Sequence, residues 1–198
     1  MRSLLLCMLV IVAVCPIIST TAEPIFGPQA ATNDTIPKQL ARGAVGLRAG
    51  IINTGTLEEG DIERDPNLGA TGGVFFDVPT LGKLMTTFSI DIYDVRLKRV
   101  SERFIDVSLG FKWVFHKYRQ KMAWKPGAAV GIGYLADMGQ VSASTFLTVK
   151  GFLEMMLFTD GRHAWVFDLG WVVAPVGSNE VHEVSLAPSI YLQVGIAY

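Results

Sequence analysis

The chain has 198 residues, half of them hydrophobic, and a mean hydropathy of +0.37. This length favours a single domain. Its 17 basic and 18 acidic residues give a formal net charge of −1, which is too balanced to indicate a nucleic acid or a strongly charged partner.

The start of the chain has the pattern of a secretory signal peptide. Arg2 precedes an apolar run over residues 4–14, and the small and polar stretch "ISTTAEP" follows. A basic start, a short apolar middle and small residues at the end predict cleavage after Ala22, which would remove residues 1–22. The alternative is an uncleaved signal anchor.

Both cysteines, Cys7 and Cys15, lie inside this predicted signal. The mature chain is therefore predicted to contain no disulfide, so its stability must come from burial and backbone pairing. Lipid attachment at Cys15 is a weaker alternative, because Val14 stands where a lipoprotein signal needs a small residue.

After the predicted signal, residues 23–41 contain three prolines and no sustained periodicity, which predicts a flexible periplasmic leader. The rest of the chain, residues 42–198, alternates between extended segments and turn-rich stretches. The predicted strands cover residues 42–52, 70–78, 83–94, 102–116, 121–135, 142–158, 163–173 and 183–198. Long and short connections alternate, so the short ones and both chain ends fall at the same end of a meander. This plan predicts an all-β fold, an eight-stranded antiparallel up-and-down transmembrane β-barrel.

The predicted strands carry one apolar face and one mixed face. In the fourth strand, Ile105, Val107 and Leu109 share a face, and Asp106 and Lys112 lie on the other. A soluble barrel turns its apolar face inward, and a membrane barrel turns it outward. Alternation alone leaves both arrangements open.

The positions of the large aromatic residues favour the membrane arrangement. All four tryptophans lie on apolar faces and are predicted near strand ends. The girdle at the short-turn end contains Trp113, Trp124, Trp165 and Tyr198, joined by Phe115 and Phe158, and the girdle at the opposite end contains Trp171 and Tyr134. Indole and phenol rings favour the boundary between lipid and water, because each ring is apolar and carries one polar group. The alternative is that these rings fill the ends of a soluble core.

Three segments carry a family resemblance: "GGVFFDVPTLGKLMTTFSIDIY", "KPGAAVGIGYL" and the terminal "YLQVGIAY". Over residues 42–198 the chain resembles the small bacterial outer-membrane β-barrel proteins, the group that includes the OmpX-like, OmpA-barrel and OmpW-like families. The resemblance implies a monomer in the bacterial outer membrane, in contact with lipid and lipopolysaccharide. It also implies that the barrel-assembly machinery recognises the last strand, which ends in an aromatic residue.

The face opposite to the apolar one is predicted to point into the barrel. Its charged residues are Arg48, Asp77, Asp91, Asp106, Lys112, Lys150, Glu154 and Asp168. Buried charges are costly unless they pair or stay hydrated, and Lys150 with Asp168 is the best candidate pair. Because the interior of an eight-stranded barrel is about wide enough for side chains, this charged network is expected to fill the lumen rather than to line a pore.

Two prolines lie within predicted strands. Each removes one ladder hydrogen bond, so Pro188 is expected near the outer rim or at a bulge, and Pro126 raises the same question near the lower rim.

Catalysis is not predicted. An outer-membrane hydrolase that modifies lipid A would need a histidine, a serine and a carboxylate near the outer rim. His116 and His163 fall at the opposite end, and His182 lies in a loop near Ser178 without a matching motif. The histidines are too scattered for metal binding, and no cofactor is predicted.

The sequence predicts a structural, surface-interaction or small-solute role. The first outer loop is the candidate contact surface, with a solvated mobile loop as the alternative. Its charged residues are Glu58, Glu59, Asp61, Glu63 and Asp65 beside Arg64. The competing hypothesis is a secreted soluble barrel, similar to lipocalins, that binds an apolar ligand inside.

Overall fold

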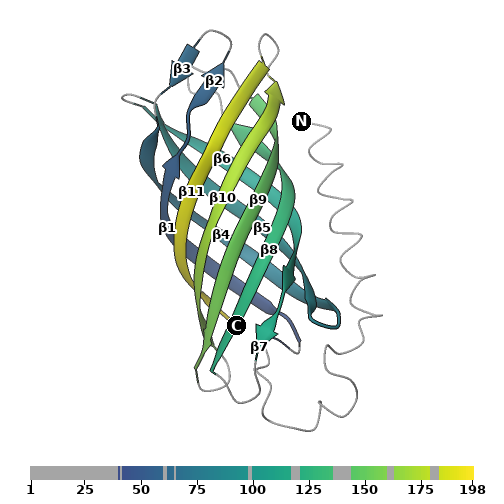
Figure 1. Cartoon of the computed structure of the whole chain (residues 1–198). Helices are drawn as coiled ribbons and strands as arrows, with labels where there is room; N and C mark the ends of the chain where they lie inside the picture. The colour runs from purple at the N-terminus through teal and green to yellow at the C-terminus, as the bar shows by residue number, and fades with distance from the viewer. Residues whose placement is uncertain are drawn as a thin grey trace.

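The computed structural model describes residue 40 and residues 42–59, 62–64, 66–97, 100–116, 121–135, 144–159, 163–178 and 183–198, which form a closed barrel of tilted strands (Figure 1). The wall consists of β1 (Ala44–Thr54), β4 (Asn67–Leu81), β5 (Leu84–Leu97), β6 (Val100–Trp113), β8 (Met122–Leu135), β9 (Ser144–Phe158), β10 (Ala164–Ser178) and β11 (Glu183–Ala197). Three short strands are β2 (Leu57–Glu59), β3 (Ile62–Arg64) and β7 (Phe115–His116). The predicted eight-stranded antiparallel barrel is confirmed.

The barrel closes between its first and last long strands. β1 pairs antiparallel with both β4 and β11. At the end of this seam the amide of Tyr198 donates to the carbonyl of Val45 at 2.9 Å, and the amide of Val45 donates to the carbonyl of Tyr198 at 3.2 Å. Closure leaves the long strands without an open edge, which is the condition that lipid imposes on a sheet. The C-terminus and β7 mark the lower end, and β2 and β3 mark the upper end (Figure 1).

The structure adds one feature to the predicted connections. The first outer loop contains a small hairpin, in which β2 pairs with both β3 and β11. The pairing of β1 with β11 stops at Asn53 and Ile190, although β11 begins earlier, at Glu183. β2 occupies the edge of β11 that β1 leaves. In the described part of the chain, no helix is both long and apolar enough to cross a membrane.

Pro188 lies at a bulge, as predicted. The register between β10 and β11 shifts between the pairs Val172–Ser189 and Ala174–Leu186, which leaves one extra residue on β11. Loss of an amide donor is tolerated at such a point because the ladder is already interrupted.

Pro126 also lies opposite a gap. It pairs with Leu153 on β9, but the ladder on its other side runs from Lys112–Gly127 directly to Phe115–Trp124.

The two faces of each strand are arranged as in a membrane barrel. Leu192 and Val194 on the outer wall are 48% and 42% exposed, whereas Lys150 and Asp168 are 2% and 0% exposed inside. Apolar side chains cover the outside and charged ones lie within, which is the inverse of a soluble barrel. The predicted orientation is therefore confirmed, and the lipocalin-like alternative is wrong.

Glycines and aromatic rings are paired across neighbouring strands of the interior. Each ring fills the space that a Cβ on the facing glycine would need. The pairs are Phe75 with Gly46, Phe104 with Gly133, Phe146 with Gly177, Phe152 with Gly127, and Tyr191 with Gly170. The missing side chains let large rings lie flat on the wall, which is how a narrow lumen holds five of them.

Candidate functional site: the charged interior

The barrel interior holds all eight charged residues that parity predicted. Arg48 is 8% exposed, and the others are at most 2% exposed. The structure adds Lys125, which is completely buried. Its neighbour Trp124 is 40% exposed on the outer wall, so the alternation that places this tryptophan outside already points Lys125 inward.

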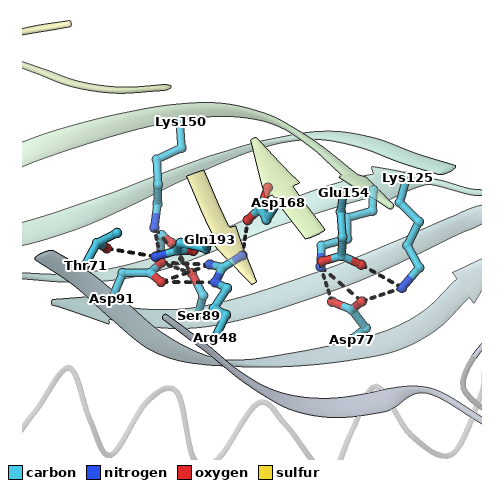
Figure 2. A network of polar contacts seen from close by, with 12 residues as sticks. Arg48, Thr71, Asp77, Ser89, Asp91, Lys125, Lys150, Glu154, Asp168 and Gln193 are labelled. Carbon is cyan, nitrogen blue, oxygen red and sulfur yellow. Dashed lines mark hydrogen bonds and ion pairs between the residues drawn. The ribbon is translucent and has the colours of Figure 1, made fainter. Parts of the chain in front are cut away.

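An upper cluster, centred on Asp91, contains five of these residues: Arg48, Asp91, Asp106, Lys150 and Asp168. Figure 2 labels all of them except Asp106. Both carboxylate oxygens of Asp91 accept hydrogen bonds of 3.0 Å from Nη2 of Arg48, and Oδ2 also accepts one of 2.8 Å from Nζ of Lys150. The guanidinium of Arg48 pairs with Asp168 as well. Nζ of Lys150 lies 2.5 Å from Oδ2 of Asp106. Each cation is therefore shared between two carboxylates.

The predicted pair of Lys150 with Asp168 is wrong, because each has a different partner. Lys150 stands opposite Val172 on β10, four positions from Asp168 along the strand. Asp168 instead lies beside Glu154 on one side and Gln193 on the other.

The remaining four residues form a lower cluster of two lysines and two carboxylates. Nζ of Lys112 lies 2.8 Å from Oδ1 of Asp77 and 2.6 Å from Oε2 of Glu154. Nζ of Lys125 lies 3.0 Å from both Oδ2 of Asp77 and Oε1 of Glu154. Every lysine contacts every carboxylate, so this cluster is a closed, neutral ring. Nζ of Lys112 also lies 4.6 Å from the centre of the Phe75 ring, within the range of a cation–π contact.

Two apolar layers enclose the charged clusters. The upper apolar layer consists of Ile52, Tyr93, Phe104, Leu135, Phe146, Val172, Ala174, Leu186 and Tyr191. The lower apolar layer consists of Leu40, Ala44, Phe75, Met85, Val114, Ala123, Met156, Phe158, Ala164, Val166 and Ala197. The charged side chains thus lie in a polar compartment, with an apolar layer toward each end of the barrel.

The upper cluster carries more carboxylates than cations, and two oxygens nearby are unsatisfied. Oδ1 of Asp168 and Oε1 of Gln193 have neither a hydrogen bond nor an ion pair within the described residues. The two residues face each other across β10 and β11, and the amide nitrogen of Gln193 donates to Thr71 at 2.8 Å. Two facing acceptors lack a donor between them.

The described residues do not form a metal-binding group. The described residues contain no group of three or more His, Cys, Asp or Glu side chains placed to hold a metal. His163 packs edge-on against Tyr198 at the lower end, with 4.6 Å between ring centres. His182, Asp61 and Asp65 lie outside the described residues, as do the predicted signal and most of the leader. For His116, Ser178, Glu58, Glu59, Glu63 and Arg64 the structure describes the backbone alone.

The aromatic residues predicted for the girdles all lie on the outer wall. Trp113, Trp124, Trp165, Tyr198, Trp171 and Tyr134 are between 40% and 59% exposed. Trp165 and Tyr198 lie at lower strand ends, and Tyr134 lies one residue before the upper end of β8.

Two aromatic placements are wrong. Trp171 lies in the middle of β10 rather than at its end, because β10 continues to Ser178, five residues beyond the predicted end at residue 173. Phe158 is 8% exposed and belongs to the lower apolar layer, because it shares the inward face of Glu154 and Met156.

Comparison with known proteins supports the fold. No family model and no curated protein matches the sequence. The structure of Neisserial surface protein A (NspA) matches with a TM-score of 0.54 and 12% identity, over 79% of this chain and 98% of that chain. This chain has the fold of the small bacterial outer-membrane β-barrels.

Two further solved outer-membrane barrels give lower scores. The N-terminal β-barrel domain of Pseudomonas aeruginosa OprF matches with a TM-score of 0.49 and 9% identity, over 79% of this chain and 98% of that chain. Ail, the attachment invasion locus protein of Yersinia pestis, matches with a TM-score of 0.47 and 10% identity, over 79% of this chain and 99% of that chain. The fold assignment does not depend on either.

Proposed function

We propose that this protein is a closed, non-conducting barrel of the bacterial outer membrane, with a structural or surface-interaction role and no catalysis. The observation that carries the proposal is that paired charges and apolar side chains fill the interior. Nine buried charged residues bind one another in two clusters, and apolar layers lie above and below them. A solute crossing this lumen would have to break several ion pairs and pass two apolar layers. Each buried charge that loses its partner costs on the order of several kcal/mol.

The outer wall supports placement in a membrane. Apolar side chains such as Leu47, Leu169 and Ile190 are more than half exposed. A continuous apolar exterior needs a partner of the same kind, and the acyl chains of lipid and lipopolysaccharide supply it. The predicted signal at residues 1–22 would direct the chain to export.

The last strand supports recognition by the barrel-assembly machinery. Tyr198 is 59% exposed, and its backbone bonds to Val45 complete the seam between β1 and β11. An assembly factor that holds this strand would therefore control the final step of closure. The seam completes the cylinder within one chain, which favours a monomer.

Single-channel recording in planar bilayers tests the closed lumen. The protein is purified from outer membranes, and heat-modifiable gel mobility confirms that the barrel is folded. We expect no steady conductance. A reproducible open level would contradict the proposal, and if Lys150→Ala or Asp168→Ala left that level unchanged, these side chains would not lie on the ion path.

A further inference from the structure

Leu40 precedes the barrel wall but lies inside it. It is completely buried and belongs to the lower apolar layer, together with inward-facing residues at the lower ends of the strands. The sequence predicted a flexible leader up to residue 41, and the burial of Leu40 shows that the end of this segment is held by the barrel.

Gly43, the residue directly before β1, makes a sharp turn in the backbone. Gly43 has φ +94°, a left-handed conformation that other residues adopt only with strain. A Cβ on Gly43 would also collide with the carbonyl oxygen of Asp77, which stands opposite Ala44 in the register of β1 and β4. The sharp turn at Gly43 lies against the wall, and Arg42 beside it is exposed.

Many of the wall residues at the lower end of the barrel have small side chains. Four of the ten wall residues in the lower apolar layer are alanines: Ala44, Ala123, Ala164 and Ala197. An alanine side chain reaches less far toward the axis than a larger apolar one, and close packing requires another group to fill the space beside it. Leu40 supplies an apolar side chain from outside the wall.

We infer that Leu40 is a plug that seals the periplasmic mouth of the barrel against water and small ions. Leu40 binds within the lower apolar layer, and it shields the lower cluster of Asp77, Lys112, Lys125 and Glu154 from water. The inference rests on the proposed function only in taking the lower end to face the periplasm and the lumen to be closed.

Thiol accessibility tests the plug. Cys7 and Cys15 are replaced by serine, and a single reporter is introduced as Ala123→Cys in the lower apolar layer or Ala174→Cys in the upper one. Both alanines are completely buried. The full chain is exported, purified from outer membranes in detergent, and treated with a positively charged methanethiosulfonate reagent, and the rate of modification is measured.

With Leu40 intact, both reporters should react slowly. Leu40→Gly and Leu40→Asp should speed the reaction of the lower reporter about tenfold or more, the factor expected when a buried leucine no longer holds its segment in place. The upper reporter should keep its slow rate. Leu40→Met, which conserves apolar volume, and Arg42→Asp, which places the same acid at an exposed position nearby, should leave both rates unchanged.

Three results would overturn the plug. Rapid reaction of the lower reporter with Leu40 intact would show that the mouth is open. Continued protection after Leu40→Gly and Leu40→Asp would show that the wall seals itself. Equal acceleration of both reporters, with heat-modifiable mobility retained, would show that Leu40 stabilises the whole wall. Bilayer conductance of the unmodified protein separately tests the closed lumen, so a failure of the plug can be distinguished from a failure of the proposed function.

Discussion

Removing Lys125 should destabilise the barrel far more than the loss of one ordinary ion pair. Its ammonium group lies 3.0 Å from both Asp77 and Glu154, and all three side chains are at most 2% exposed. Lys125→Met leaves two buried carboxylates to share the single charge of Lys112. Breaking one partner out of a buried ion pair costs about 3–5 kcal/mol, because the remaining charge stays uncompensated.

A double-mutant cycle separates this charge effect from packing. Lys125 and Glu154 stand opposite each other on β8 and β9, and Lys125→Met with Glu154→Gln leaves the 2.8 Å pair of Lys112 with Asp77. The double variant should recover most of the loss, with a coupling energy of about 2–3 kcal/mol.

Denaturant unfolding of the barrel in lipid vesicles, followed by tryptophan fluorescence, measures these free energies. Lys83→Met removes an exposed lysine in the turn before β5 and is the matched control, with an expected change within about 0.5 kcal/mol. If Lys125→Met cost no more than Lys83→Met, water would have to reach the lower cluster, and the sealed compartment would be refuted.

Three further predictions use the same unfolding assay. Asp168→Asn should be nearly neutral or stabilising, because the new amide can donate to the unsatisfied Oε1 of Gln193 and the loss of one negative charge balances the interior. Asp91→Asn should instead cost about 2–4 kcal/mol. Equal costs would contradict this difference. Gly170→Ala should cost about 1–3 kcal/mol, because its Cβ would overlap the ring of Tyr191, and Gly72→Ala, which meets its nearest neighbour at 3.3 Å, should cost less; the reverse order would refute the packing argument. Raising the salt concentration from about 0.1 to about 1 M should change stability little, since buried pairs are screened far less than surface pairs; a large loss would indicate that the clusters are hydrated.

Much of this architecture is readable from the sequence because a strand repeats with a period of two. Once Trp113 and Leu109 are assigned outward, Lys112 and Asp106 must point inward, and no knowledge of neighbouring strands is needed. The specific pairs require more. The cation that pairs with Asp168 depends on the register between β10 and its neighbours and on distances across the lumen. In the structure that cation is Arg48 of β1, whereas Lys150 stands opposite Val172 and pairs elsewhere.

Other features depended on contacts without a local signal. Trp171 is central because β10 continues to Ser178 beyond its predicted end, and β2 pairs with the part of β11 that extends beyond the pairing with β1. The burial of Leu40 also has no signal in the local sequence. A single leucine after a proline-rich stretch has no periodicity, and only the structure shows that it is buried beside the alanines of the lower apolar layer.

The charged interior also explains how one strand register is selected. A slip by one residue at β9 would move Lys150 and Glu154 from the lumen to the lipid face, and it would bring Leu153 and Leu157 inside. A charged residue on the lipid face near the bilayer midplane costs about 2–4 kcal/mol, so each misplaced charge adds to the penalty. The clusters join side chains from β1, β4, β5, β6, β8, β9 and β10, so a slip in any of these strands breaks an ion pair elsewhere. Replacing both clusters by apolar side chains would therefore retain a filled lumen but remove the energetic difference between registers, because apolar residues would then occupy both faces of the wall.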